Sequence, residues 1–308
     1  MHYREFRAMS TGILLAAEGP IEAVETGFSQ AQAVIESGEK RFSRFLEDSE
    51  LSQLNRSAGK WFEASPDLFS VLSEAMRLHS LTLGLFDPSV LNALEQAGYN
   101  RTIDEVRRVD SPPAGPLLRC GRYHFSDLVL EADGNRVWLP PELRIDLGGI
   151  AKGWIAEQAA GALSSWSEAC IVDAGGDMFM VGLPKGQPDW RIALEDPFNA
   201  EQDLAILNVK PGAIATSTVT RRRWTQGGQE RHHLIDPRTG QPAVTDWVSV
   251  TAMAAHAIDA EVFAKSLLIA GSQEANRLTI NLKGIEFIAV DRQKKLFGSQ
   301  NSREVYHV

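Results

Sequence analysis

The stretch from Arg144 to Gly153, RIDLGGIAKG, constrains the fold of this chain more than any other feature. Alternating apolar residues predict a short strand over Leu143–Leu147, and the apolar spacing from Ile150 onward predicts a helix. The two glycines between them allow a loop whose backbone N–H groups bind a phosphate at a helix start. Lys152 adds a cation and Asp146 a carboxylate, although many turns of this kind only reverse the chain.

Charge and cysteine content argue against several classes of protein. The 308 residues allow a large core, in one elaborate domain or in two smaller ones. The net charge is −9 and the longest basic run is Arg221–Arg223, so we expect no nucleic-acid partner, because such a partner needs a face of clustered cations. Cys120 and Cys170 stand far apart without a CxxC or His-rich neighbour, which indicates buried thiols rather than a metal or redox pair.

The start of the sequence shows no export signal. Its only apolar run, Ile13–Ala17, is too short for the core of a signal peptide, and no lipobox-like cysteine follows. No stretch is long and apolar enough to span a membrane. We therefore expect a cytoplasmic protein that does not insert into a membrane.

Apolar periodicity predicts a mixture of helices and strands. We expect helices over residues 21–45, 49–55, 66–81 and 258–270, the last one ended by Gly271, and a surface loop at Asp110–Pro116. We expect strands over residues 6–17, 123–128, 137–139, 143–147, 169–174, 178–181, 190–194, 204–209, 214–216, 219–225, 230–235, 247–253 and 285–290. Because these elements mingle without regular βαβ spacing, the sequence predicts an α+β fold, with mainly antiparallel sheets and packed helices.

Four further stretches place polar side chains at turns or element ends. Ala174–Asp177 (AGGD) is either a tight turn or a point where the backbone approaches a ligand. The hydroxyls of Thr216–Thr218 either donate to a phosphate or are solvated. His233 ends an apolar strand before an Asp-Pro turn, which places an imidazole at a sheet edge, although a lone histidine is more often structural. Glu261 and Lys265 have the spacing of an intrahelical ion pair.

Taken together and in order, these stretches resemble the ApbE family of FAD:protein FMN transferases. The motifs that carry the resemblance are DLGGIAKG (146–153), the Gly-Gly-Asp turn (174–177), ATS (215–217), HxxDPRTG (233–240) and a late helix that runs to a glycine (260–271). Residues 9–11, 42–55, 85–90 and 190–197 also resemble family segments. The matches cover nearly the whole chain.

The resemblance implies a fold and a reaction. The fold would be ApbE-like, with T-fold-like halves, as a single domain over residues 1–308 that is either undivided or built from two intertwined subdomains. The enzyme would cleave FAD, attach FMN by a phosphoester bond to a threonine or serine of a target flavoprotein, and release AMP. Such phosphoryl transfer needs in-line geometry, neutralisation of the pyrophosphate charge, and a base for the attacking hydroxyl.

The resemblance also implies site residues. His233 would be the catalytic base, and FAD would be bound by Met9, Phe45, Leu85, Phe86, Asp87, Asp146, Lys152, Thr216 and Ser217. Mg²⁺ would be bound by the Gly149 carbonyl and by the residues at two late helix positions, where the family usually has aspartate and threonine.

Those two late positions are Glu261 and Lys265 in this chain. A glutamate can bind Mg²⁺, whereas an ammonium group cannot. Lys265 therefore either replaces part of the metal's charge or points outward into solvent. Two alternatives to the transferase stay open: an FAD-binding protein or FAD pyrophosphatase that modifies no protein, and a flavin carrier without catalysis.

Overall fold

The computed structural model describes residues 1–108, 123–282, 284–299 and 306–307. The chain divides into two compact units, each assembled from separate segments. Unit 1 consists of Met1–Gly38, Lys152–Thr220 and Asp246–Val308, and unit 2 consists of Glu39–Ala151 and Arg221–Thr245. The predicted loop at Asp110–Pro116 and the thiol of Cys120 lie outside the described residues.

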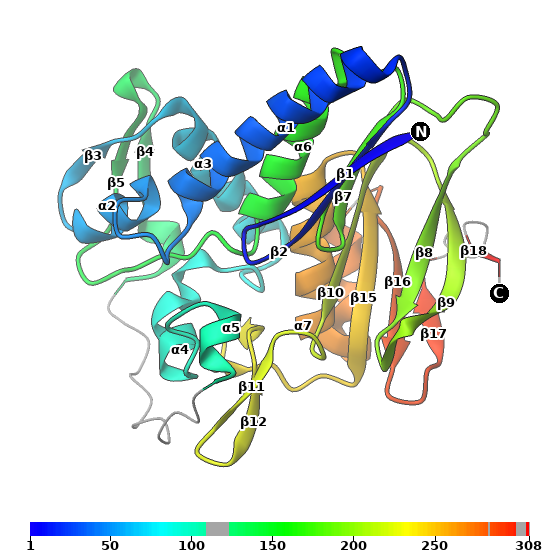
Figure 1. Cartoon of the computed structure of the whole chain (residues 1–308). Coiled ribbons are helices and arrows are strands. Elements are labelled where there is room, and N and C mark those ends of the chain that lie inside the picture. Colours follow the sequence, from blue (N-terminus) through cyan, green and yellow to red (C-terminus); the bar gives the residue numbers. More distant parts are fainter. Residues whose placement is uncertain (109–122, 283, 300–305, 308) are drawn as a thin grey trace. The chain divides into compact units, whose positions relative to one another are not determined.

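Unit 1 is built on an eight-stranded sheet of order β1-β2-β6-β7-β10-β15-β16-β17 (Figure 1). All of its described pairings are antiparallel, as the sequence predicted. The strands are β1 (His2–Ala8), β2 (Thr11–Ala17), β6 (Cys170–Ala174), β7 (Asp177–Val181), β10 (Gly212–Thr218), β15 (Trp247–Ala254), β16 (Glu286–Asp291) and β17 (Leu296–Gly298).

Helix α7 (Ala257–Asn281) covers one face of this sheet (Figure 1). The alanines Ala213 and Ala215 of β10 pack against Ala257 and Ala260 of α7. Small side chains on both elements allow the helix to lie close to the strand, so polar groups further along α7 come near the end of β10.

The other face of the sheet packs against a second sheet. This sheet consists of β8 (Trp190–Asp196), β9 (Asn199–Val209) and β18 (Tyr306–His307). Ile214 alternates with the two alanines that face α7, and it packs with Trp190 and Leu207 instead. The large sheet is therefore buried on both sides.

Helices α1 (Ile21–Phe42) and α6 (Ala151–Ser164) pack against each other within unit 1. A Cβ atom on Gly38 would lie 2.6 Å from Ile155 Cγ1. The glycine that interrupts the apolar pattern of the predicted helix over 21–45 therefore marks a close helix contact, and the helix continues through it to Phe42.

Two predicted elements of unit 1 are corrected by the structure. The single strand over 6–17 is a hairpin, β1 and β2, whose turn residues Met9 and Ser10 have φ values of 53° and 56°. Since residues other than glycine seldom adopt such values, the turn carried no sequence signal. The predicted helix does end at Gly271, whose φ of 64° and ψ of −177° are not helical, but α7 as a whole is longer: a second helical run, which was not predicted from the sequence, follows the glycine and extends to Asn281.

Unit 2 combines short helices with small sheets. Its helices are α2 (Glu50–Arg56), α3 (Pro66–Leu81), α4 (Leu91–Gln96) and α5 (Ile103–Val106), with 3₁₀ turns η1 (Pro88–Val90), η2 (Phe125–Asp127) and η3 (Asp133–Asn135). Its sheets are β3-β5-β4, β11-β12 and β13-β14, formed by β3 (Trp61–Glu63), β4 (Val129–Glu131), β5 (Arg136–Trp138), β11 (Arg223–Gln226), β12 (Gln229–His232), β13 (Ile235–Asp236) and β14 (Gln241–Pro242). The helices predicted at 49–55 and 66–81 and the hairpin with its tip at Gly227-Gly228 are confirmed.

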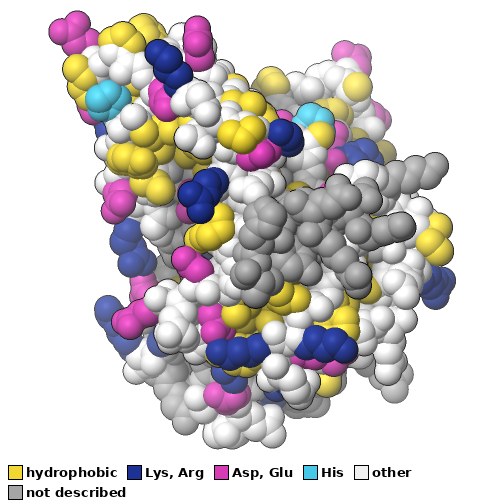
Figure 2. Space-filling view, turned by 90° about the vertical axis from the view of Figure 1, so that its right-hand side faces the viewer, with side chains coloured by type: hydrophobic (Ala, Val, Ile, Leu, Met, Phe, Trp, Pro, Cys, Tyr) yellow, Lys and Arg dark blue, Asp and Glu magenta, His cyan; other side chains and the backbone are white. Residues whose placement is uncertain are grey.

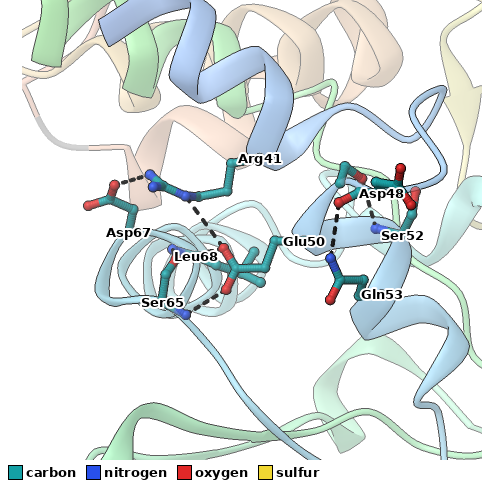
Figure 3. A network of polar contacts seen from close by, with 9 residues as sticks. Arg41, Asp48, Glu50, Ser52, Gln53, Ser65, Asp67 and Leu68 are labelled. Carbon is teal, nitrogen blue, oxygen red and sulfur yellow. Dashed lines mark hydrogen bonds and ion pairs between the residues drawn. The ribbon is translucent and has the colours of Figure 1, made fainter.

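A polar network joins the starts of α2 and α3 in unit 2 (Figure 3). The Glu50 carboxylate accepts from the Ser65 backbone N–H over 2.5 Å and from its hydroxyl over 2.7 Å. Ser65 Oγ accepts in turn from the Leu68 N–H over 3.2 Å, which caps α3. Arg41 Nε lies 3.4 Å from Glu50 Oε2 and its guanidinium also pairs with Asp67. Glu50 therefore links the starts of α2 and α3 and supports the fold here.

Two predicted strands of unit 2 are wrong. Residues 123–128 form no strand; they contain the 3₁₀ turn η2 (Phe125–Asp127), at whose start the Asp127 carboxylate accepts from the His124 N–H over 2.8 Å. Residues 143–147 form no ladder with another strand. Their polar backbone groups find other partners: the Ile145 N–H donates to Asn55 Oδ1 over 2.8 Å, and the Asp146 N–H donates to the Pro88 carbonyl over 2.8 Å.

The described residues also bear on the predictions for the cysteines and for membrane insertion. Cys170 lies in β6 and is buried, and burial raises the pKa of its thiol to about 12. Among the helices that the structure describes, none has the length and hydropathy to cross a membrane. On the face shown in Figure 2, lysine and arginine side chains are interspersed with acidic and hydrophobic ones.

Candidate functional site

The predicted site residues divide between the two units. Unit 1 contains Met9, Lys152, Thr216, Ser217, Glu261 and Lys265, and unit 2 contains Phe45, Leu85, Phe86, Asp87, Asp146, Gly149 and His233. Each unit has its own arrangement of these residues.

In unit 1 the Lys152 ammonium group lies between two buried carboxylates. Lys152 stands in the first turn of α6 and forms an ion pair with Asp177, the first residue of β7. Its Nζ also donates to Glu261 Oε1 over 3.1 Å. Asp177 is 4% exposed and Glu261 2%, so the lysine neutralises charge that water cannot reach. Asp177 is the last residue of the Gly-Gly-Asp turn, and it was not predicted from the sequence as a site residue.

Glu261 of α7 has three donors around it. Its Oε1 lies 3.7 Å from Nζ of Lys265, one helical turn further along, and its Oε2 accepts from the Gly153 N–H over 2.8 Å. Burial acts to raise the pKa of this carboxyl, but the Lys152 and Lys265 charges and the Gly153 N–H outweigh burial and lower the pKa. Glu261 is therefore ionised at neutral pH and bound on both oxygens.

Gly153 allows α6 to begin in contact with α7. A Cβ atom at this position would lie 2.6 Å from the Ala257 carbonyl oxygen and 2.8 Å from its carbon. Those are backbone atoms, so a side chain at Gly153 would force the two helices apart. The last glycine of RIDLGGIAKG thereby sets the distance at which its own N–H reaches Glu261.

Thr216 and Ser217 point to opposite faces of β10. Thr216 Oγ1 is hydrogen-bonded to Thr251 Oγ1 of β15 at 2.8 Å. Ala215 packs against α7, so Ser217, two residues on, lies on the α7 side and Thr216 on the other side. The two hydroxyls predicted to bind FAD therefore do not share one face of the sheet.

Two turns, Met9-Ser10 and Gly175-Gly176, lie together where neighbouring strands of the large sheet in unit 1 begin and end; we call this the turn edge of the sheet. A Cβ atom on Gly175 would overlap Thr11 Oγ1, so the Gly175-Gly176 turn touches the residue that follows the Met9-Ser10 turn. The pairing of Ala215 with Asp177 brings the end of β10 to the same edge. This edge thus gathers the Met9 turn, the Lys152 partner Asp177 and the hydroxyls of β10.

In unit 2, Asp146 pairs with a buried arginine. Arg44 Nε lies 3.4 Å from Asp146 Oδ1, and the Arg44 side chain is 6% exposed. Arg44 Nη2 donates to the Tyr99 carbonyl over 2.7 Å, and its guanidinium carbon lies 4.2 Å from the centre of the Phe45 ring. One arginine thus contacts two of the predicted FAD-binding residues, Phe45 and Asp146, and the only sequence signal for it was its place in the family-like stretch 42–55.

The segment Leu85–Asp87 is held largely by structural contacts. Leu85 and Phe86 are 6% and 4% exposed. The Phe86 carbonyl accepts from His79 Nδ1 over 2.8 Å. The Asp87 carboxylate accepts from the Ser89 N–H over 2.7 Å and so caps η1. The family-like sequence of this segment is therefore explained in part by the fold alone.

Asn55 positions the approach to the glycine loop. Its side-chain amide donates to the Ile145 carbonyl over 2.9 Å and accepts from the Ile145 N–H, as a neighbouring strand would. The Leu147 carbonyl then accepts from the Ile150 and Ala151 N–H groups over 3.0 and 2.8 Å, closing the turn around Gly149. Asn55 was not predicted as a site residue, but it is the last residue of the family-like stretch 42–55, and this resemblance was the sequence signal that could have identified it.

His233 stands between β12 and β13, beside a locked turn. Its backbone N–H donates to the Arg222 carbonyl over 3.3 Å, and its Nδ1 atom is buried. The Asp236 carboxylate accepts from the Arg238 N–H over 2.9 Å and pairs with the Arg238 guanidinium at 2.8 Å. The Asp and Arg of the HxxDPRTG signature therefore hold the turn, and the role of His233 as a base stays a prediction.

The residues predicted to hold Mg²⁺ do not fit this ion at α7. Both Glu261 oxygens already accept from nitrogen donors, and Lys265 presents a cation instead of an oxygen. Mg²⁺ requires oxygen ligands in near-octahedral geometry. Within the residues that the structure describes, no three or more His, Cys, Asp or Glu side chains gather in an arrangement able to hold a metal ion.

Comparison with known proteins gives consistent matches. The ApbE family matches residues 9–289 of the chain. An FAD:protein FMN transferase of Vibrio cholerae is 31% identical over 263 residues, which are 82% of this chain and 77% of that protein. An FAD:protein FMN transferase of Treponema pallidum is 26% identical over 298 residues, 91% of this chain and 81% of that protein.

Solved structures share the fold. The crystal structure of the ApbE protein of Thermotoga maritima has a TM-score of 0.84 at 23% identity, over the full length of both chains. The flavin transferase ApbE of Vibrio cholerae has a TM-score of 0.78 at 24% identity, over 99% of this chain and 98% of that one. At these identities the likeness establishes the α+β architecture common to all three chains.

Proposed function

The chain belongs to the ApbE family, and on that premise we propose that it is an FAD:protein FMN transferase. The enzyme cleaves FAD, attaches FMN by a phosphoester bond to a threonine or serine of a target flavoprotein, and releases AMP. The observation that carries this proposal is the match along residues 9–289, together with a relative of that name at 31% identity over most of both chains.

The chemistry is a single phosphoryl transfer. The acceptor hydroxyl oxygen forms a bond to the FMN phosphorus, the bond from that phosphorus to the AMP oxygen breaks, and the hydroxyl proton passes to a base. We assign the proton to His233, whose position is supported by the turn that Asp236 and Arg238 lock directly after it.

Lys152 supplies positive charge for the pyrophosphate. Its side chain is 16% exposed and its ammonium group is held by Asp177 and Glu261, so the position of this charge is set before a ligand arrives. A charge fixed in advance stabilises a transition state without the cost of rearrangement. The contacts of FAD with Met9, Phe45, Leu85, Phe86, Asp87, Asp146, Thr216 and Ser217 stay predictions, as does any Mg²⁺ bound through the Gly149 carbonyl.

One incubation tests the proposed function. The full chain is mixed with FAD, Mg²⁺ and a flavoprotein that carries an acceptor threonine, and AMP and covalent flavin fluorescence on the partner are measured. We expect both, and we expect no labelling when that threonine is replaced by alanine. AMP and free FMN without labelling would indicate a pyrophosphatase, and bound FAD without AMP would indicate a carrier.

We define the target flavoprotein by its acceptor group alone: it presents a threonine or serine hydroxyl to the FMN phosphorus. A cytoplasmic location for this chain also stays a prediction from the sequence, and fractionation of cells followed by immunoblotting tests it.

A further inference from the structure

Four side chains in unit 1 form a cluster whose formal charges cancel. Lys152 pairs with Asp177 and Glu261, and Lys265 lies against Glu261. Asp177 and Glu261 are 4% and 2% exposed, and each lysine side chain is 16% exposed. We name these four residues the α6–α7 charge cluster. Because it is already neutral, it offers a divalent cation no net negative charge.

Both oxygens of the Glu261 carboxylate already have nitrogen donors next to them, at the positions where an ion would bind. Oε1 has Lys152 Nζ at 3.1 Å and Lys265 Nζ at 3.7 Å, and Oε2 has the Gly153 N–H at 2.8 Å. Mg²⁺ binds oxygen at about 2.0–2.1 Å, so an ion on Oε1 would lie beside two ammonium groups. Repulsion between such charges is far stronger in a buried site than in water.

The Lys265 side chain is not turned into solvent. It is 16% exposed and its Nζ stays within ion-pair distance of a carboxylate that is 2% exposed. The structure therefore distinguishes between the two possibilities that the sequence left open. The Lys265 ammonium group lies next to Glu261. The site has therefore not merely lost one metal ligand: it has gained a positive charge in that ligand's place.

We propose that the α6–α7 charge cluster takes the place of a metal ion at α7: Lys152 and Lys265 supply the positive charge there, and no divalent cation binds to Glu261. With the proposed function as premise, FAD cleavage by this chain then proceeds without Mg²⁺ at this position. The metal-binding part of the proposal does not depend on that premise.

Direct metal binding is the first test. Mn²⁺ is titrated into the full chain without flavin, and free Mn²⁺ is followed by electron paramagnetic resonance. The variants are Lys265→Thr, which adds an oxygen ligand, and Lys265→Met, which removes the charge without adding a ligand. Lys210→Thr is the matched control, because Lys210 is 72% exposed and pairs with Asp189 elsewhere in unit 1. Thermal melts establish that each variant is folded.

We expect Lys265→Thr to bind Mn²⁺ at least about tenfold more tightly than the natural chain, which corresponds to 1.4 kcal/mol or more. Lys265→Met should gain less, and Lys210→Thr should not differ from the natural chain. The proposal is overturned if the natural chain binds one Mn²⁺ that Glu261→Gln removes, or if Lys265→Thr binds no more tightly than the natural chain.

Activity provides a second, separable test. AMP release from FAD is measured in EDTA and in Mg²⁺ for the natural chain and for Lys265→Thr. Mg²⁺ should stimulate Lys265→Thr at least about threefold more than the natural chain, since only the variant can bind an ion at α7. An equal Mg²⁺ response of the two proteins overturns the proposal. If no AMP forms under either condition, the proposed function fails instead, and the Mn²⁺ comparison still decides the metal question.

Discussion

The Lys152 ammonium group forms ion pairs with two buried carboxylates and, in the proposed reaction, lies against the FAD pyrophosphate as well. We expect Lys152→Ala to weaken FAD binding by roughly 10- to 100-fold, the range that corresponds to one hydrogen bond to a charged group. Riboflavin, which has no phosphate, should bind nearly as well as before. Flavin fluorescence quenching measures both affinities.

Lys152 also supports the fold, so the Lys152→Ala result needs a stability control. Urea unfolding of the variant shows how much stability is lost with the cation between Asp177 and Glu261. Lys210→Ala removes an exposed lysine of the same unit and should change neither ligand's affinity. An equal loss of FAD and riboflavin binding in folded Lys152→Ala would mean that the lysine is structural only.

His233 is the second residue at which the proposed chemistry can be tested. If it accepts the proton of the acceptor hydroxyl, His233→Ala should bind FAD normally and transfer FMN about 100- to 10,000-fold more slowly. His232→Gln is the matched control, because the His232 ring donates to the Ala243 carbonyl over 3.1 Å and a glutamine amide can replace that donor. Near-normal transfer by His233→Ala would remove this residue from the mechanism.

At the residue scale, the sequence indicated which residues belong to the candidate site better than it indicated which residues they contact. Lys152, Glu261 and Lys265 were singled out, and the i,i+4 spacing of the last two does produce contact. Asp177 and Arg44 were missed as partners because each meets its partner across a long sequence separation. No local spacing encodes such a contact; Asp177 is placed by the antiparallel pairing of β7 with both β6 and β10.

At the element scale, Gly153 and Gly161 of α6 provide a matched pair of sites for substitution by alanine. Ala at Gly153 would meet the Ala257 carbonyl at 2.6 Å, whereas a Cβ at exposed Gly161 meets nothing within 4 Å. We therefore expect Gly153→Ala to destabilise the protein by about 1–3 kcal/mol, as overpacking does. Gly161→Ala should stabilise it by about 0.4–1 kcal/mol, since a glycine in a helix costs backbone entropy.

Urea unfolding followed by circular dichroism measures both glycine variants. Gly153→Ala should also loosen the charge cluster, because the Gly153 N–H donates to Glu261. If the two substitutions had the same effect on the unfolding midpoint, the close contact of α6 with α7 would not be what requires glycine at 153.

Most elements were predictable because their apolar periodicity is strong, and two of the failures have identifiable physical causes. The strand expected at 143–147 has the right alternation, but Asn55 satisfies its backbone instead of a neighbouring strand. The hairpin turn at Met9-Ser10 lacks the glycine or asparagine that usually reveals such turns. In both places a tertiary contact or a strained turn overrides the local pattern.

At the scale of the whole molecule, the chain divides into two units built from interleaved segments. The prediction of a single domain with two intertwined subdomains stays a prediction, and the units can be compared by their response to acid. Unit 2 contains His232, whose pKa burial lowers below its ordinary value of 6.5. Unit 1 contains Glu261, Asp196 and Asp246, whose pKa values lie below the ordinary values of 4.5 and 3.8.

These groups predict that acid destabilises the two units in different pH windows. As the pH falls below 6.5, His232 gains a proton more readily in the unfolded chain than in the folded one, so unit 2 loses stability. The carboxylates of unit 1 contribute their full stability above pH 4.5 and lose it only as the pH falls through their lowered folded values. Between pH 7.5 and pH 5.5, hydrogen exchange corrected for its intrinsic pH dependence should therefore quicken in β12 and β13 and stay constant in β10 and α7.

His232→Gln identifies the group responsible for the first of these windows. The glutamine amide can donate to the Ala243 carbonyl as the ring does, but it does not titrate. Exchange in β12 and β13 of this variant should then be nearly independent of pH between 7.5 and 5.5, while the exchange of unit 1 follows the natural chain. A variant that still quickens as the natural chain does would show that another group of unit 2 sets its acid response. Equal quickening of both units in the natural chain would show instead that they open together, as a single cooperative domain does.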